Sequence, residues 1–155
     1  MPINSRSKGR AGEQEVCRWL NSIAAEVYRS KGLEPPETPL FQRNQNQTAV
    51  GGSDITNPYG LSIEVKRHEQ LAVDTWWQQC YEDSVAFGGI PVLLYRQNGK
   101  RKWRAVMMVH VPLSCHLDRG ESSYRFMPVR AEFRHEDFER FLYTWILDNM
   151  GVATL

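Results

Sequence analysis

Residues 51–67 constrain the fold more than any other stretch of the chain. An Asn-Pro-Tyr-Gly tetrad at positions 57–60 separates two short runs in which apolar and polar residues alternate. Proline presets the backbone angle φ of a turn, and glycine accepts the conformation that often follows it. The stretch is therefore predicted to be a β-hairpin.

The side chains of the second predicted strand divide between two faces. Because successive side chains of a strand alternate, Ile63 and Val65 can face a core while Glu64 and Lys66 lie together on the other face. Asp54, on the first strand, lies nearly across the hairpin from Glu64. Facing like charges are destabilising unless they are neutralised, and a hard divalent cation with oxygen ligands would neutralise them. The alternative is an exposed hairpin with solvated charges.

The apolar spacing before the hairpin predicts a helix over about residues 8–31, ended by Gly32. Glu13 lies about 20° from Leu20 around this helix, and therefore on its core-facing side. A carboxylate in that position is costly without a partner or a metal ion. The alternative is that Glu13 is a first-turn acid stabilised by the helix dipole.

A short strand is predicted at residues 40–43, after a proline-rich loop. This strand carries Arg43 toward the charged patch, where its guanidinium could contact a phosphate. An ordinary surface arginine is the alternative.

A second helix is predicted to start at Asp74, as its N-cap, and to run to Phe87, before Gly88-Gly89. Gln78 or Gln79 on this helix could reach the charged patch, or be a solvated amide. The apolar run at residues 90–95 is then typical of a strand covered on both faces.

Five cations surround the predicted turn at Asn98-Gly99. Such a cluster, with a tryptophan among the cations, suits contact with a phosphate backbone. A merely solvated turn is the alternative. The five residues are Arg96, Lys100, Arg101, Lys102 and Arg104.

The C-terminal part is predicted to be irregular at 111–123, a strand at about 124–133 and a helix at about 135–150. The apolar stripe of this helix is rich in aromatic residues. Core packing explains the stripe, and a dimer surface is the alternative.

Composition limits the classes of function. A chain of 155 residues fits one domain, and a net charge of +1 gives no whole-molecule field for nucleic acid. Its three cysteines show no Cys-x-x-Cys spacing, and Cys115-His116 alone is poor zinc-binding spacing. Without a signal-like or membrane-spanning apolar run, we expect a cytoplasmic protein with reduced thiols and no membrane partner.

Several motifs occur in an order that resembles one nuclease family. They are Lys8-Gly9-x-x-x-Glu13, Gly52-Ser53-Asp54-Ile55, Ile63-Glu64-Val65-Lys66, Phe87-Gly88-Gly89-Ile90-Pro91-Val92-Leu93 and Trp103-Arg104. Together they resemble the archaeal-type Holliday junction resolvases of the PD-(D/E)XK nuclease superfamily. The resemblance spans about residues 8–109. The double tryptophan and the residues after about 110 depart from it, and look more like phage-encoded relatives whose preferred DNA structure can differ.

The resemblance implies an α/β fold with a restriction-endonuclease-like core. A mixed central β-sheet would be flanked by helices, with an extra C-terminal strand and helix. We expect a single nuclease domain over 1–155, with its core at about 8–109 and a C-terminal extension at 110–155.

The resemblance also implies an active site and its partners. The catalytic residues would be Glu13, Asp54, Glu64 and Lys66, with Arg43 in the place of an arginine that those resolvases carry before the hairpin. We expect Asp54, Glu64 and the main-chain carbonyl of Val65 to bind Mg²⁺, for which Mn²⁺ could substitute, and Glu13 to complete the shell or hold a second ion. Lys66 would orient the attacking water. The implied partners are DNA, in branched form, and a second copy of the chain.

Two other functions fit the same residues. One is a catalytically inactive DNA-binding module on this fold, although such a module has no need for two carboxylates beside a phosphate backbone. The other is a restriction-type endonuclease that cuts linear duplex DNA. We expect DNA contacts from Arg43, Gln79 and the five cations of the 98–99 turn in each case.

Overall fold

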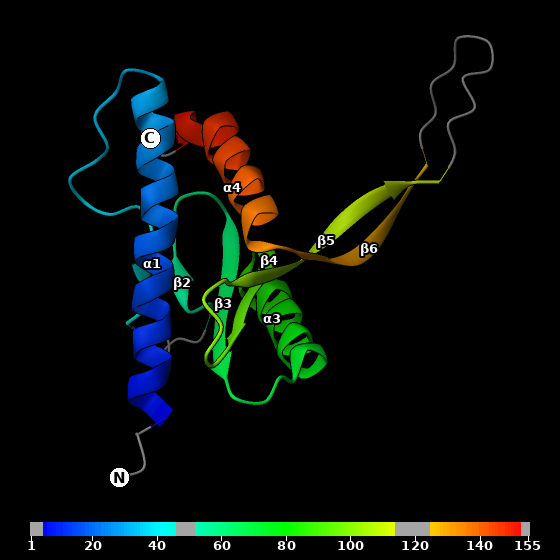
Figure 1. Ribbon diagram of the computed structural model, residues 1–155. Helices are drawn as coiled ribbons and strands as arrows, with labels where there is room; N and C mark the ends of the chain where they lie inside the picture. The colour runs from blue at the N-terminus through cyan, green and yellow to red at the C-terminus, as the bar shows by residue number, and fades with distance from the viewer. Residues whose placement is uncertain (1–4, 46–51, 114–124, 153–155) are drawn as a thin grey trace, which may run out of the picture.

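The computed structural model describes residues 5–45, 52–113 and 125–152, and these form a mixed six-stranded sheet between helical layers (Figure 1). The strands lie in the order β1-β2-β3-β4-β5-β6. The elements are α1 (Ser5–Ser30), β1 (Gln42–Arg43), β2 (Ile55–Thr56), β3 (Leu61–His68), α3 (Val73–Phe87), β4 (Ile90–Gln97), β5 (Arg104–Pro112), β6 (Phe126–Phe133), α4 (His135–Asn149) and a 3₁₀ turn (Met150–Val152). The predicted fold class is confirmed.

Strand pairing places the hairpin of β2 and β3 near the end of the sheet that is formed by the two short strands β1 and β2. β3 and β4 are parallel, with α3 as the crossover between them, and the other neighbouring strands are antiparallel. β2 is only two residues long, and its register with β3 joins Ile55 to Ile63. Within the described residues, β2 therefore pairs only with the amino-terminal half of β3, and no strand pairs with the carboxyl half of β3 on that side.

Alternation along β3 and β4 sends side chains into two separate apolar layers. One layer, beneath α1 and α4, contains Ile63, Val65, Val92 and Leu94. The other, beneath α3, contains Trp76, Trp77, Leu93 and Tyr95. Both faces of β4 are covered, as its continuous apolar run predicts.

Glu64 and Asp54 are both buried, with 3% and 7% of their surface exposed. Glu64 lies in register with Leu93 of β4, on the face that α3 covers. The alternative of an exposed hairpin with solvated charges is therefore wrong.

Helix boundaries follow the predicted signals with one exception. α1 ends at Ser30, and Gly32 follows in the turn with a φ of 69°, the left-handed conformation that glycine accepts. The predicted N-cap at Asp74 is wrong, because the N–H of Trp76 bonds to the carbonyl of Ala72 and starts α3 earlier. Asp74 lies in the first turn instead, where its carboxylate pairs with Arg130 at 2.7 Å.

The C-terminal elements complete the fold. β5 continues through residues 111–112, where an irregular segment was expected, because β6 pairs with it as far as Pro112 and Phe126. Residues 114–124, with Cys115 and His116, lie outside the described ranges. β5 and β6 form a two-stranded arm that extends away from the helices (Figure 1).

The apolar stripe of α4 packs within the chain. Phe138, Leu142 and Ile146 are fully buried in the layer shared with α1. Core packing is confirmed for these three residues, and Phe141 and Trp145 of the stripe are partly buried against the same layer. Among the helices of the described residues, none is both long and apolar enough to cross a membrane.

Candidate active site

The predicted catalytic residues come from separate segments that meet beside β3. Glu13 lies on α1, Asp54 immediately precedes β2, and Lys66 lies on β3. These three residues and Val65 line one pocket of about 530 Å³. The structure therefore brings the helical acid, the hairpin acid and the amine to one cavity.

Asp54 is held in a fixed orientation by the backbone of β3. Its N–H donates to the Ile63 carbonyl at 2.9 Å, and its Oδ2 accepts the Val65 N–H at 2.7 Å. The N–H and C=O of one strand residue point to the same side of the strand. The Val65 carbonyl is therefore directed toward the Asp54 side of β3, as a main-chain ligand would require.

Glu64 and Lys66 form an ion pair on the same face of β3. The Lys66 Nζ lies 3.0 Å from Glu64 Oε1. Burial, together with the neighbouring Asp54 charge, raises the pKa of Glu64 to about 7, and the Lys66 ammonium offsets only part of this rise. Lys66 alone therefore does not supply enough positive charge to neutralise both carboxylates of the Asp54–Glu64 pair when they are ionised.

Glu13 lines the pocket and pairs with Arg43, a contact that its position on the helix did not predict. Its Oε2 accepts a hydrogen bond from Arg43 Nε at 2.6 Å. α1 starts at Ser5, so Glu13 lies beyond the first turn, and the alternative of a first-turn acid is wrong. The side chain of Arg43 is only 22% exposed and is held by this acid, so it is not an ordinary surface arginine.

The donor set can be compared with what a metal ion needs. Two buried carboxylates and a main-chain carbonyl are hard oxygen donors, which suit Mg²⁺, an ion that keeps several of its waters. Within the described residues, no group of three or more His, Cys, Asp or Glu side chains is placed to hold a metal. Asp54, Glu64 and Val65 thus fit the ion chemically, whereas Glu13 is held by Arg43.

One comparison with known proteins bears on this site. The model of a family described as "Phage putative PDDEXK endonuclease" matches residues 4–151. The chain belongs to this family. It is therefore a PD-(D/E)XK endonuclease by membership, a class that is typically metal-dependent and for which DNA is the implied substrate. No curated protein and no solved structure matches the chain.

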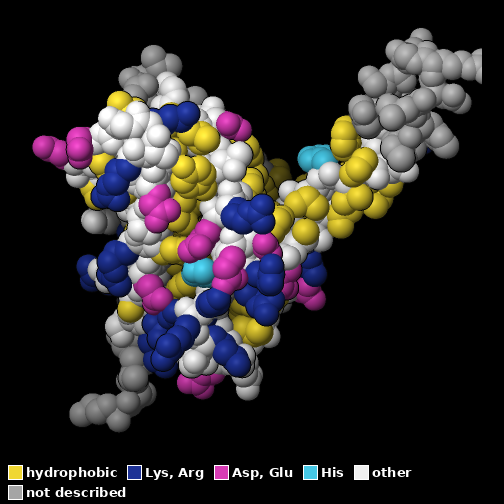
Figure 2. Space-filling model, turned by 45° about the horizontal axis from the view of Figure 1, so that its top comes forward, with side chains coloured by type: hydrophobic (Ala, Val, Ile, Leu, Met, Phe, Trp, Pro, Cys, Tyr) yellow, Lys and Arg dark blue, Asp and Glu magenta, His cyan; other side chains and the backbone are white. Residues whose placement is uncertain are grey.

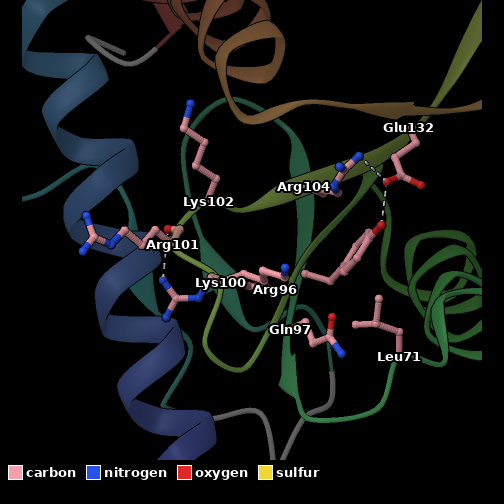
Figure 3. Close-up of a pocket in the computed structure, with 9 residues that line it drawn as sticks. Leu71, Arg96, Gln97, Lys100, Arg101, Lys102, Arg104 and Glu132 are labelled. Atoms are coloured by element: carbon pink, nitrogen blue, oxygen red, sulfur yellow. Dashed lines mark hydrogen bonds and ion pairs between the residues drawn. The ribbon is translucent and has the colours of Figure 1, made fainter.

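In this PD-(D/E)XK endonuclease the predicted basic cluster surrounds a second cavity, of about 680 Å³ (Figure 3). Arg96 is only 8% exposed, and its guanidinium binds both carboxylate oxygens of Glu15, at 2.5 and 2.8 Å. It also lies over the Trp103 ring, 4.7 Å from the centroid. Arg96 therefore has a structural partner and little surface for a phosphate.

Two more cations of the cluster are paired with acids. Arg104 binds Glu132 at 3.1 Å, and the same Glu132 oxygen accepts the Tyr95 hydroxyl at 2.6 Å. Lys102 pairs with Glu136. Lys100 and Arg101 make no ion pair with a carboxylate in the part of the chain that the structure describes.

Gln79 of the endonuclease lies on the exposed side of α3 and lines neither cavity. Glu15 is the residue that sequence reasoning missed. It lies off the apolar stripe of α1, and its partner Arg96 is 81 positions away, so no local spacing could indicate the pair.

Proposed function

We propose that the chain is a Mg²⁺-dependent DNA endonuclease whose active site is the pocket lined by Glu13, Asp54 and Lys66. The observation that carries the proposal is the buried Asp54–Glu64 pair beside the Lys66 ammonium group, with Asp54 and Lys66 lining one cavity. Such an arrangement is costly for stability, and phosphodiester hydrolysis is a chemistry that uses it.

Asp54, Glu64 and the Val65 carbonyl would hold Mg²⁺, and Mn²⁺ would fit the same oxygen donors. The bound ion would polarise a phosphoryl oxygen and stabilise the leaving oxygen. The chain contributes ligand orientation, since the Val65 N–H donates to Asp54 Oδ2 and fixes this carboxylate beside β3.

Lys66 would orient the attacking water and stabilise the charge that develops on the phosphate. Its Nζ lies 3.0 Å from Glu64 Oε1. This ion pair restricts the lysine side chain to a position beside the proposed ligands. Because Glu64 Oε1 already engages this ammonium group, we assign it positioning of the water and not proton abstraction.

Glu13 would complete the ligand shell or hold a second ion. The Nε of Arg43 lies 2.6 Å from Glu13 Oε2 and holds the Glu13 carboxylate at the pocket wall. Arg43 would act through this acid and, when DNA is bound, on a phosphate next to the one that is cut.

The finer substrate assignment is branched DNA, for which the resemblance to Holliday junction resolvases is the support. Cutting both strands of a two-fold DNA structure requires two such sites, and a symmetric pair of chains supplies them. Phe138, Leu142 and Ile146 of the α4 stripe are buried within the chain, so a pair of chains would have to contact through other residues.

The test is cleavage of a panel containing a four-way junction, a flap, a fork and linear duplex, with and without Mg²⁺. We expect Asp54→Asn and Glu64→Gln to lose cleavage while DNA binding persists, and Glu82→Gln, on the exposed side of α3, to cut like the wild type. Wild-type cutting by Asp54→Asn would refute the site. Binding without any cutting by the wild type would favour the inactive module, and a preference for linear duplex would favour a restriction-type enzyme.

A further inference from the structure

A groove of about 710 Å³ lies between α1, residues 37–39 and β1. We call it the α1–β1 groove. Arg43 lines this groove and Glu13 lines the catalytic pocket, and the two side chains are joined at 2.6 Å. The Glu13–Arg43 pair is therefore the wall that the two cavities share.

One face of α1 supplies cations to the α1–β1 groove. Arg10, Gln14 and Arg18 recur at four-residue spacing, which places them on one side of the helix. Arg10 and Arg18 are exposed, and neither pairs with a carboxylate among the described residues. Glu37 is the acid that lines the groove with them. The groove thus carries an excess of available positive charge.

The floor of the groove is fixed at both ends of β1. The Asn21 amide donates to the Phe41 carbonyl at 2.8 Å and accepts the Phe41 N–H at 2.9 Å. The Arg43–Glu13 pair fixes the other end. A groove built this way needs little rearrangement to receive a ligand.

The chemistry of the groove suits an extended polyanion. Arg10 and Arg18 are two helical turns apart, about 12 Å along the axis, which is too far for one phosphate and suitable for two phosphates of one strand. Gln14, Gln42 and Gln45 add amide groups that can bond to phosphate oxygens. By contrast, three cations of the 98–99 turn are already bound to Glu15, Glu132 and Glu136.

We propose that the α1–β1 groove binds the backbone of the DNA strand beside the phosphate that is cut, through Arg10 and Arg18. The proposal rests on the endonuclease function and adds a contact region on the α1 side of the catalytic pocket. It assigns backbone contact without sequence readout, since guanidinium and amide groups would meet phosphate oxygens.

The experiment measures DNA affinity against salt concentration for Arg10→Ala, Arg18→Ala and the double variant. The background is Asp54→Asn, which has the same groove and leaves the DNA intact. Each lost phosphate contact reduces the slope of log K against log salt by about one. We expect the double variant to bind about tenfold more weakly at low salt, with a slope smaller by about two.

The matched control is Arg29→Ala. Arg29 is exposed on the last turn of α1 and does not line the groove, so we expect its affinity and slope to equal those of the background. Thermal melting verifies that each variant is folded. An unchanged slope in the folded double variant, or an equal loss with Arg29→Ala, would overturn the groove assignment. Wild-type cleavage, measured separately, tests the endonuclease function, so the two failures are distinguishable.

Discussion

The surroundings of the Glu64 carboxyl group favour its neutral form. Its side chain is buried between β3 and α3, and the charges of Asp54 and Asp83 add to the effect of burial. Lys66 compensates only in part, and the pKa of Glu64 is raised to about 7. The residue that would help to hold a metal ion is therefore also a source of instability when no ion is bound.

The first prediction concerns the pH dependence of stability in metal-free buffer. Because the pKa of Glu64 is higher in the folded chain than its usual 4.5, its contribution to stability is full below about pH 4.5 and is lost as the pH rises through about 7. Glu64→Gln removes this loss, so we expect it to exceed the wild type in unfolding free energy at pH 8 by about 1–3 kcal/mol. Urea unfolding at pH 5 and pH 8 measures the difference. An advantage that is equal at both pH values would contradict the prediction, and exposed Glu82→Gln is the control.

The second prediction concerns binding of the metal ion itself. A ligand that binds only the folded chain raises its stability, so we expect millimolar Mg²⁺ to raise the melting temperature of the wild type by a few degrees. The rise should be lost in Asp54→Asn and Glu64→Gln and retained in Glu82→Gln. Thermal melting with and without Mg²⁺ provides the measurement, and an equal rise in all four proteins would argue against these ligands.

At the residue scale, local alternation predicted the Asp54, Glu64 and Lys66 arrangement because a hairpin fixes which side chains share a face. The pairing of Glu13 with Arg43, 30 positions apart, and of Glu15 with Arg96 depends on how α1 packs on the sheet. Sequence spacing carries no such information. The basic cluster could therefore be predicted from the sequence, but the ion pair between Arg96 and Glu15 could not.

At the scale of elements, apolar periodicity predicted the first and last helices and the alternating strand of the hairpin, because packing on one face imposes it. The start of α3 was missed, since Ala72 begins the helix without a side-chain cap. The aromatic stripe of α4 left core and interface open, because both bury the same surface. Only the position of α1 decides between them.

The third prediction tests whether α4 is an integral part of the core. Leu142 is fully buried beneath α1, whereas Leu113, one residue beyond β5, is 51% exposed. Removal of a buried leucine side chain typically costs about 2–5 kcal/mol, so Leu142→Ala should lower the unfolding free energy by that amount. Leu113→Ala, the same change at an exposed site, should stay within about 0.5 kcal/mol. Denaturant unfolding of both variants makes the comparison, and equal effects would show that α4 is a peripheral addition.

At the scale of the whole molecule, charge is arranged locally. The net charge of +1 gives no long-range attraction to DNA, yet Lys and Arg side chains gather on one face with acids between them, while the arm bears mainly hydrophobic side chains (Figure 2). The α1–β1 groove and the cavity at the 98–99 turn are both distinct from the proposed active-site pocket. DNA contact is thus expected to depend on a few residues beside the site, and to weaken steeply with salt.

The fourth prediction follows from the number of active sites. The described residues of one chain hold one Asp54–Glu64–Lys66 site, so we expect paired cuts in a symmetric substrate to come from two chains. When wild type is mixed with excess Asp54→Asn, most of the pairs that contain a wild-type chain would contain only one, and nicked intermediates of a four-way junction should accumulate. Excess Arg29→Ala, which keeps every site residue, should leave paired cutting unchanged. Denaturing gels of the time course give the measurement, and sedimentation gives the number of chains. Paired cutting that is indifferent to the inactive chain would mean that one chain makes both cuts in turn.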